Sequence, residues 1–147
     1  MTTDTDRELV DELHARSQRV TSQRLVIHRI LRERETHLSA EEVHRDALQA
    51  LPGVSLPTVY ATLELLTEMG LVRRIDAGTG TVLFDGRQEP HHHAVCRVCG
   101  RVWDLAPRVD LTAVAQDARE AGLRVDGMQV LATGICARCD ERRRRAG

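Results

Sequence analysis

The amino-acid sequence predicts an α+β protein, with an N-terminal winged helix-turn-helix domain followed by a small α/β domain that contains a four-cysteine site. Periodic apolar positions behind helix caps extend to residue 69, and two strand-like runs around a glycine-containing turn come next. The second half alternates strand-like runs with one helical stretch and contains all four cysteines. We therefore expect four parts along the 147 residues: a domain at 1–86, a hinge at 87–90, a domain at 91–141 and an arginine-rich tail at 142–147.

Four helices are predicted in the first domain from their apolar spacing and their first residues. The first covers residues 6–16. The other three have capping residues, and we expect them to begin after Thr21, Ser39 and Ser55. Glu42, three residues after Ser39, completes a capping box, and Gly70 suits the end of the fourth helix.

A β-hairpin is predicted after these helices, from the strand-like runs at 71–76 and 81–86. Three helices followed by a hairpin, here after one extra N-terminal helix, is the winged-helix pattern, whose last helix enters the major groove of DNA. A purely structural helical bundle gives the same pattern of apolar positions. DNA binding is therefore one of two interpretations of this half.

The second half is predicted to be a small α/β unit. Residues 94–106 and 123–139 are strand-like, and a helix at 109–121 closes at Gly122. Asp126-Gly127 interrupts the second strand-like run. The strand-like runs offer an edge with which a second subunit can pair.

The four cysteines form two CxxC pairs, 36 residues apart. Each CxxC loop can present two sulfurs to one ion at about 2.3 Å, and four thiolates match a closed tetrahedral zinc site. A thioredoxin-like redox site is the alternative, but that motif occurs once rather than twice. We expect a structural Zn²⁺ bound by Cys96, Cys99, Cys136 and Cys139.

A second set of metal-binding residue types surrounds the first CxxC pair. His91 and His93 alternate in an extended stretch, so their side chains point to the same side. Asp85 precedes the hinge, Asp104 follows the first CxxC strand, and His37 lies in the loop before the third helix. Three imidazoles and two carboxylates suit Fe²⁺ or Mn²⁺, and Zn²⁺ less specifically. Taken alone, His37 is typical of a solvated surface residue, and Asp85 of a turn.

Net charge, apolar stretches and cysteine usage limit the partners and the compartment that we expect for this protein. The formal net charge is −1, so the charge balance alone does not indicate a nucleic-acid partner. No apolar stretch approaches about 18 residues and no signal-like segment opens the chain, so we expect a soluble cytoplasmic protein without a membrane partner. In a reducing compartment, paired cysteines indicate metal ligands rather than disulfides.

Together these motifs resemble the ferric uptake regulator family of bacterial metal-dependent repressors. The resemblance covers nearly the whole chain and rests on RVTSQRLVIHRIL (19–31), HLSAEEVH (37–44), VSLPTVYATLELLTEMGLVRRI (54–75), LFDG (83–86), HHHAVCRVCGRVWDL (91–105) and GICARC (134–139). It implies a winged helix, a dimerisation domain and zinc held by the four cysteines. The implied function is repression of transcription, not catalysis, and the implied partners are a second copy of the chain and a double-stranded DNA operator.

The resemblance also implies functional residues. The family's regulatory metal site matches five positions, occupied here by His37, Asp85, His91, His93 and Asp104. The implied cation is Fe²⁺ or Mn²⁺, with Zn²⁺ as an alternative, and it would join the two domains in the DNA-competent shape. The expected DNA contacts are Thr58, Tyr60, Thr62, Arg19 and Arg24. Packing of Tyr60 in the core and solvation of the two arginines are the alternatives.

Asp104 is the residue type of the peroxide-sensing branch, whereas iron-responsive relatives more often have Glu there. In that branch peroxide oxidises ligating histidines, at positions that match His37 and His91. A reversible iron-, zinc- or manganese-responsive repressor is the alternative.

Two positions depart from the family. Ala61 follows Tyr60 where relatives have Arg or Asn, and a further metal site of relatives keeps only His92, because its other positions read Pro90, Leu111 and Met128.

Two other functional classes fit parts of the sequence. A zinc hydrolase could use the HHH run at 91–93, but no HExxH-type pattern supplies a general base. A zinc-ribbon interaction module would not need the N-terminal winged helix. For the arginines at 142–145, we expect a disordered solubilising tail rather than a DNA-binding one.

Overall fold

The computed structural model describes residues 3–34, 37–76, 78, 80–86, 92–105 and 109–147. The chain divides into two compact units: unit 1 comprises residues 1–76 and 80–88, and unit 2 comprises residues 77–79 and 89–147. The predicted α+β fold, with N-terminal helices, a wing and a cysteine cluster, is confirmed. The expected hinge at 87–90 lies outside the described residues.

Four helices form most of unit 1, with bounds α1 Asp4–Ala15, α2 Ser22–Glu33, α3 Ala40–Ala50 and α4 Leu56–Glu68. The side chains of Thr21, Ser39 and Ser55 each accept a backbone N–H from the first turn, so the predicted caps are confirmed. The capping box at α3 is also present, because the Ser39 N–H donates to Glu42 Oε2 at 2.8 Å. Gly70 follows α4 with a φ of 75°, a left-handed conformation that favours glycine.

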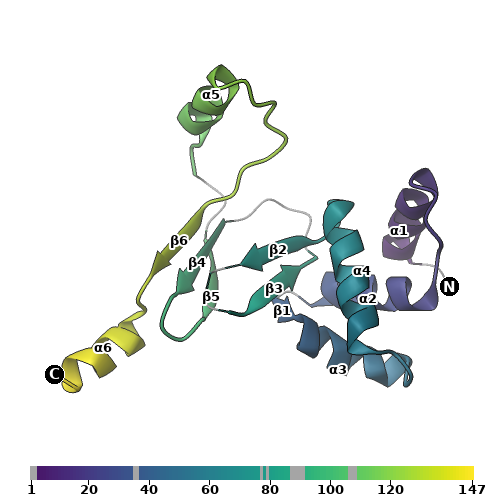
Figure 1. Ribbon diagram of the computed structural model, residues 1–147, viewed down its shortest axis with the longest axis horizontal. Coiled ribbons are helices and arrows are strands. Elements are labelled where there is room, and N and C mark those ends of the chain that lie inside the picture. Colours follow the sequence, from purple (N-terminus) through teal and green to yellow (C-terminus); the bar gives the residue numbers. More distant parts are fainter. Residues whose placement is uncertain (1–2, 35–36, 77, 79, 87–91, 106–108) are drawn as a thin grey trace. The chain divides into compact units, whose positions relative to one another are not determined.

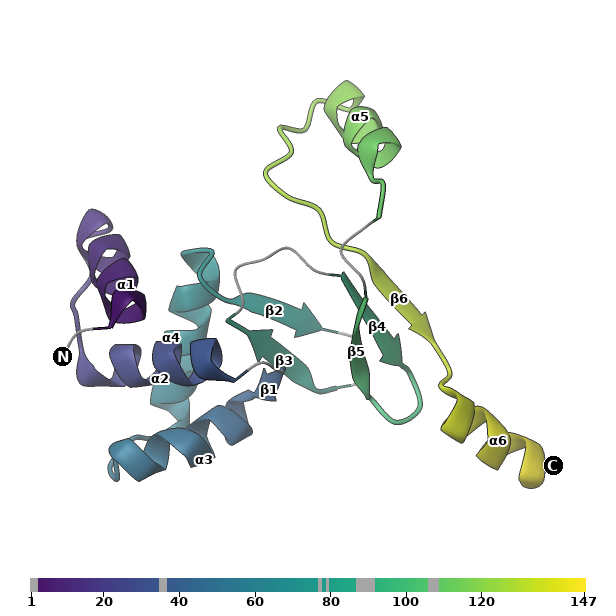
Figure 2. The same ribbon diagram turned by 180° about the vertical axis from the view of Figure 1, so that it is seen from behind.

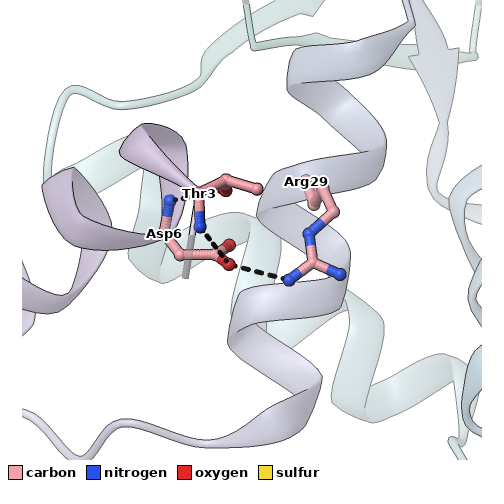
Figure 3. Close-up of polar contacts among 3 residues, drawn as sticks. All are labelled: Thr3, Asp6 and Arg29. Carbon is pink, nitrogen blue, oxygen red and sulfur yellow. Dashed lines mark hydrogen bonds and ion pairs between the residues drawn. The ribbon is translucent and has the colours of Figure 1, made fainter. Parts of the chain in front are cut away.

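Helix α1 begins earlier than predicted and is tied to α2. The Thr3 N–H donates to Asp6 Oδ2 at 3.3 Å and the Asp6 N–H donates to Thr3 Oγ1 at 3.2 Å, a capping box that the sequence interpretation missed. Arg29 Nη2 on α2 donates to the same carboxylate oxygen at 2.8 Å (Figure 3). Burial acts to raise the pKa of Asp6, but the bonds from Arg29 and Thr3 outweigh it and leave this pKa below its ordinary value.

Helices α2, α3 and α4 pack on one another around the core of unit 1 (Figures 1 and 2). The core takes fully buried side chains from all four helices, among them Leu9, Leu13, Ile27, Val43, Val59, Leu63 and Leu66. His28 is buried among them, and desolvation lowers its pKa, which favours the neutral imidazole. This aliphatic core fixes α4 against the rest of the unit.

The predicted hairpin is confirmed as β2 Arg73–Asp76 and β3 Val82–Asp85, which pair antiparallel. A further strand, β1 Leu38–Ser39, was not predicted. It pairs antiparallel with the other edge of β3, so the strand order is β1-β3-β2. Leu38 lies opposite Phe84, which brings the segment before α3 beside the end of β3. Two residues are too few for an alternating pattern to reveal such a strand.

Unit 2 contains a second three-stranded sheet, formed by β4 His92–Cys96, β5 Val102–Leu105 and β6 Leu131–Gly134. The order is β5-β4-β6, with β4 antiparallel to β5 and parallel to β6. Helix α5 Thr112–Glu120 ends before Gly122, as predicted. The strand prediction over 123–139 was wrong outside β6, because residues 123–130 form no strand or helix and the last residues start a helix.

The C-terminal arginines are helical rather than a disordered tail. Helix α6 runs Ala137–Arg145, so the expected boundary at residue 142 falls inside it. Arg144 Nη2 lies 2.9 Å from Asp140 Oδ2 one turn earlier, and Arg142 Nη2 donates to Cys139 Sγ at 3.4 Å. Cationic side chains in a last helical turn also interact favourably with the helix dipole.

Unit 2 has a very small apolar core. Among its described residues, the buried apolar side chains are only Val95, Cys96, Ala115 and Cys139. Larger apolar side chains are exposed instead, at Val98, Val109, Val114, Leu123 and Leu131. A core of this size needs support from a metal or a partner chain. None of the helices in the described ranges has the length and hydrophobicity that a membrane-spanning segment needs.

Candidate metal centres

The four cysteines meet at one end of the sheet of unit 2. Cys96 ends β4, Cys99 lies in the turn toward β5, and Cys136 and Cys139 lie at the start of α6. All four sulfurs lie within 4.8 Å of one another, and Cys99 Sγ is 3.9 Å from Cys136 Sγ. Ligands at about 2.3 Å from one tetrahedral zinc ion are about 3.8 Å apart, so the arrangement fits zinc. The thiols are free, with no disulfide between them.

The surroundings of Cys96 and Cys139 shift the pKa values of the two thiols in opposite directions. The Cys136 N–H donates to Cys96 Sγ at 3.3 Å, and this bond is the main reason why the pKa of Cys96 is lowered to about 6. Burial has the opposite effect on Cys139 and raises its pKa to about 11, although Arg142 donates to that sulfur. A cation within the cluster would compensate the charge of both thiolates, which is what a closed structural site requires.

His37 and Asp85 form a cross-strand pair in unit 1. His37 comes directly before β1 and Asp85 ends β3, so the β1–β3 ladder places them opposite each other. His37 Nε2 lies 3.4 Å from Asp85 Oδ2, and the Asp85 side chain is 0% exposed. A carboxylate removed from water requires a cation or hydrogen-bond donors. Periodicity and spacing alone could not predict this proximity, because it depends on the two-residue strand β1; only the family resemblance implied it.

The end of β3 is held against α2. A Cβ at Gly86 would lie 2.8 Å from the backbone of Leu31, so only glycine fits this approach. Arg32 Nη1 donates to the Gly86 carbonyl at 3.3 Å. These contacts restrain the backbone directly after Asp85, the last residue of β3.

His93 and Asp104 form a second cross-strand pair, this time in unit 2. The β4–β5 register places them directly opposite each other, and His93 Nε2 lies 3.5 Å from Asp104 Oδ1. The His93 side chain is fully buried and that of Asp104 is partly exposed. Cross-strand neighbours of this kind lie close enough to bind one ion.

Four of the five expected regulatory residues therefore fall into two His–Asp pairs, one in each unit. The fifth, His91, lies outside the described residues. Imidazole nitrogen and carboxylate oxygen fit Fe²⁺, Mn²⁺ or Zn²⁺. Each pair supplies only two ligands, which is fewer than these cations take in proteins.

The residues expected to face DNA lie around the starts of two helices, with Arg19 and Arg24 at α2 and Thr58, Tyr60 and Thr62 on α4. A hollow of about 280 Å³ is lined by Thr21, Gln23, Arg24, Thr58, Ala61 and Thr62. It joins the first turns of α2 and α4, whose N-terminal N–H groups favour anions such as phosphate. Sequence reasoning found Thr21 as a cap but did not place it, or Gln23, beside this hollow.

The five expected DNA-facing residues differ in exposure. Tyr60 is 41% exposed and does not pack in the core, and its hydroxyl donates to Glu41 Oε1 on α3 at 3.0 Å. Thr62 is almost fully buried and is one of the residues that line the hollow. Arg24 Nη1 donates to the Arg19 carbonyl at 2.6 Å, which ties together the two arginines at the start of α2.

Comparison with known proteins gives consistent matches over most of the chain. Residues 15–131 match the model of the ferric uptake regulator family. The ferric uptake regulation protein of Bacillus subtilis is 37% identical over 136 residues, which cover 88% of this chain and 90% of that protein. The peroxide-responsive repressor PerR of Staphylococcus epidermidis is 27% identical over 136 residues, covering 91% and 89%. The solved ferric uptake regulator of Pseudomonas aeruginosa with manganese has a TM-score of 0.72 and 27% identity, covering 87% of this chain and 97% of that one.

Proposed function

The chain belongs to the ferric uptake regulator family, and from this premise we propose that the two His–Asp pairs, together with His91, bind one divalent cation that switches DNA binding on. Members of this family are metal-dependent transcriptional repressors that bind DNA operators as dimers, and they are not enzymes.

The observation that carries the proposal is the division of ligands between the units. His37 and Asp85 belong to the unit that contains α4 and the wing, and His93 and Asp104 belong to the unit with the cysteine cluster. When bound, the cation supplies positive charge that offsets both carboxylates and accepts both imidazole lone pairs. The residues of each unit orient their own ligands through a β-ladder, so a shared ion restrains the two units in one arrangement. Metal then shifts the population toward that arrangement by its differential affinity.

The cysteine cluster has a separate, structural role in this proposal. Zinc held by Cys96, Cys99, Cys136 and Cys139 would join the end of β4 to α6 and compensate for the small core of unit 2. The open edge of β6 and the exposed apolar side chains of Val114 and Leu123 support homodimerisation through this unit.

DNA binding is proposed for the start of α4 and the hollow beside it. Thr58 and Tyr60 are available to bases or backbone at the first turns of α4. Arg24 and Arg19 stand at the start of α2, where a phosphate is favoured by both the helix dipole and the guanidinium. Thr62 lines the same hollow.

For the sensed signal, we propose peroxide, with Fe²⁺ or Mn²⁺ as the regulatory cation. Asp104 supports this, because that residue type is typical of the peroxide-sensing branch. The alternative, reversible regulation by iron, zinc or manganese, is favoured by the 37% identity to the ferric uptake regulation protein of Bacillus subtilis. Peptide mass spectrometry after Fe²⁺ loading and dilute peroxide separates them. One oxygen added to His37 or His91 supports peroxide sensing, and unmodified histidines with iron bound support reversible metal sensing.

The repressor function itself is tested by metal-dependent DNA binding. Duplexes selected from a random library in the presence of Mn²⁺ provide an operator-like probe. The zinc-loaded protein should shift this duplex with Mn²⁺ and release it on chelation of Mn²⁺. If no duplex is enriched at any Mn²⁺ concentration, the proposal is wrong and a zinc-ribbon interaction module becomes the better account.

A further inference from the structure

Two neighbouring histidines of β4 have different partners at the same ring atom. Gln129 Nε2 lies 2.6 Å from His93 Nδ1, whereas the backbone N–H of Val130 donates to His92 Nδ1 at 3.0 Å. The ladder continues between them, because the His93 N–H donates to the Val130 carbonyl at 3.0 Å. Since side chains alternate along a strand, the two imidazoles point to opposite faces of the sheet. One short segment before β6 therefore contacts both rings in different ways.

The contact to His92 fixes its tautomer. A peptide N–H can only donate, so His92 Nδ1 must accept. In the neutral imidazole the proton is then on Nε2, and neither nitrogen has a lone pair left for a cation. His92 is 5% exposed, so water has little access to the ring to replace the Val130 N–H as its partner. A backbone N–H has no acceptor atom that rotation about a side-chain bond could exchange with it.

The contact to His93 has no such restriction. His93 Nε2 faces Asp104 Oδ1 at 3.5 Å, so Nε2 is the atom turned toward its carboxylate partner. An imidazole that ligates through Nε2 has its proton on Nδ1 and needs an acceptor there, usually a carbonyl or carboxylate. A glutamine amide has both a donor nitrogen and an acceptor oxygen of nearly the same shape. Rotation of the amide by 180° therefore converts the Gln129 contact from donor to acceptor.

We propose that Gln129 is the positioning residue that allows His93 to ligate the regulatory cation through Nε2, while the Val130 N–H keeps His92 from acting as a ligand. This inference rests on the proposed function of the His–Asp pairs. It makes Gln129 and His93 a unit in which the amide orientation follows the imidazole tautomer. It also explains how adjacent histidines on one strand take different roles.

Cobalt(II) titration into zinc-loaded protein, followed by visible absorption, tests the proposal without any DNA. Gln129→Met keeps the side-chain length but cannot accept the Nδ1–H, and should weaken cobalt(II) binding about 10-fold. Gln129→Glu restores an acceptor and should bind cobalt(II) at least as tightly as the wild type. His92→Asn, whose side-chain oxygen can still accept the Val130 N–H, should leave the affinity unchanged. Gln116→Met on α5 is the matched surface control, because Gln116 is exposed and its amide donates to Glu120 Oε1 one turn along the same helix.

Nitrogen-15 NMR of labelled histidines reads the tautomers directly, with zinc(II) as the diamagnetic second ion. His93 should have its proton on Nε2 before the second ion is added and on Nδ1 afterwards, whereas His92 should keep its Nε2 proton throughout. Equal cobalt(II) affinities for Gln129→Met and the wild type would overturn the proposal. So would equal losses in Gln129→Met and Gln129→Glu, or a loss in His92→Asn. A wild-type protein that binds no cobalt(II) beyond its zinc overturns the proposed function as well, and is thereby distinguished from these outcomes.

Discussion

His37 and Asp85 face each other across strands β1 and β3, with Nε2 3.4 Å from Oδ2. His37 directly precedes β1, which leads into α3, and Asp85 is the last residue of β3. The pair therefore connects the start of α3 to the end of the β2–β3 hairpin. In unit 2 the same relationship recurs between His93 and Asp104 across β4 and β5. Each unit therefore contains one His–Asp pair, and we propose that the two pairs bind one cation.

The position of Asp85 should depend on Gly86. Gly86→Ala places a Cβ 2.8 Å from the Leu31 backbone, so the end of β3 must move away from α2. We expect a loss of about 1–3 kcal/mol in the free energy of unfolding, together with weaker Mn²⁺ binding. Urea denaturation and Mn²⁺ titration measure the two effects.

Gly53→Ala is the matched control for that variant. No atom lies within 4 Å of a Cβ at this position, so its stability and Mn²⁺ affinity should equal those of the wild type. If Gly86→Ala is as stable as Gly53→Ala and binds Mn²⁺ as tightly, the contact with α2 does not position Asp85.

Loss of the structural zinc should unfold unit 2 selectively. Cys96→Ser removes a buried ligand from a unit with a very small apolar core, so we expect no bound zinc, a monomer and a disordered C-terminal part. Trp103, the single tryptophan, lies in unit 2 with Arg101 over its ring and reports this loss by fluorescence. Helical circular dichroism from unit 1 should largely persist. A Cys96→Ser protein that keeps one zinc per chain and its dimeric state would contradict the structural role.

Stability in acid should depend in part on Asp6. The pKa of Asp6 is below its ordinary value of 3.8, so its contribution is complete above that pH and disappears as the pH falls through the folded-state pKa. Asp6→Asn should therefore lower the free energy of unfolding at neutral pH by about 1 kcal/mol. The free energy of unfolding of this variant should also fall less steeply than that of the wild type as the pH drops. Asp11→Asn, on the same helix and exposed, is the control. Urea titrations from neutral pH down to below 3.8 measure the effect, and parallel pH profiles for the two variants would refute it.

The hollow at the start of α4 should hold a DNA phosphate. Arg24→Ala should weaken binding to all duplexes similarly and reduce the slope of log affinity against log salt by about 1. Arg119→Ala, an exposed arginine of α5 in unit 2, should leave that slope unchanged. Fluorescence anisotropy over a salt series measures both variants. A normal salt slope in Arg24→Ala would place the phosphate contact elsewhere.

The sequence predicted those features that depend on local signals. Caps at Thr21, Ser39 and Ser55 and the glycine after α4 act through neighbouring backbone groups, so their patterns are visible in the chain itself. The two CxxC pairs indicated the zinc cluster for the same reason, because four thiolates have few other uses in that spacing. The prediction of a disordered tail at the arginines of α6 was wrong, because a charged segment has no apolar stripe that would indicate a helix. The helix is supported instead by the ion pair of Asp140 with Arg144, one turn later.

Residue patterns do not predict which strands far apart in the sequence pair with each other. Strand β1 has two residues and no periodicity, yet it alone brings His37 to Asp85. The roles of Gln129 and Val130 depend on the register of β6 beside β4, which the sequence does not specify. Residues 123–130 form no strand, although the run at 123–139 is strand-like; Asp126-Gly127, which interrupts that run in the sequence, lies within them.

The most direct test of the account is the Mn²⁺ dependence of DNA binding in single-ligand variants of each unit. His37→Ala and His93→Ala each remove one ligand from a different His–Asp pair, while His14→Ala removes an exposed histidine of α1 as a control. In the wild type and His14→Ala, Mn²⁺ should raise the affinity for a selected duplex about 5- to 150-fold. Both ligand variants should keep their zinc and dimeric state but gain no affinity from Mn²⁺. Full Mn²⁺ enhancement in either His37→Ala or His93→Ala would contradict the claim that one cation is shared by the two units.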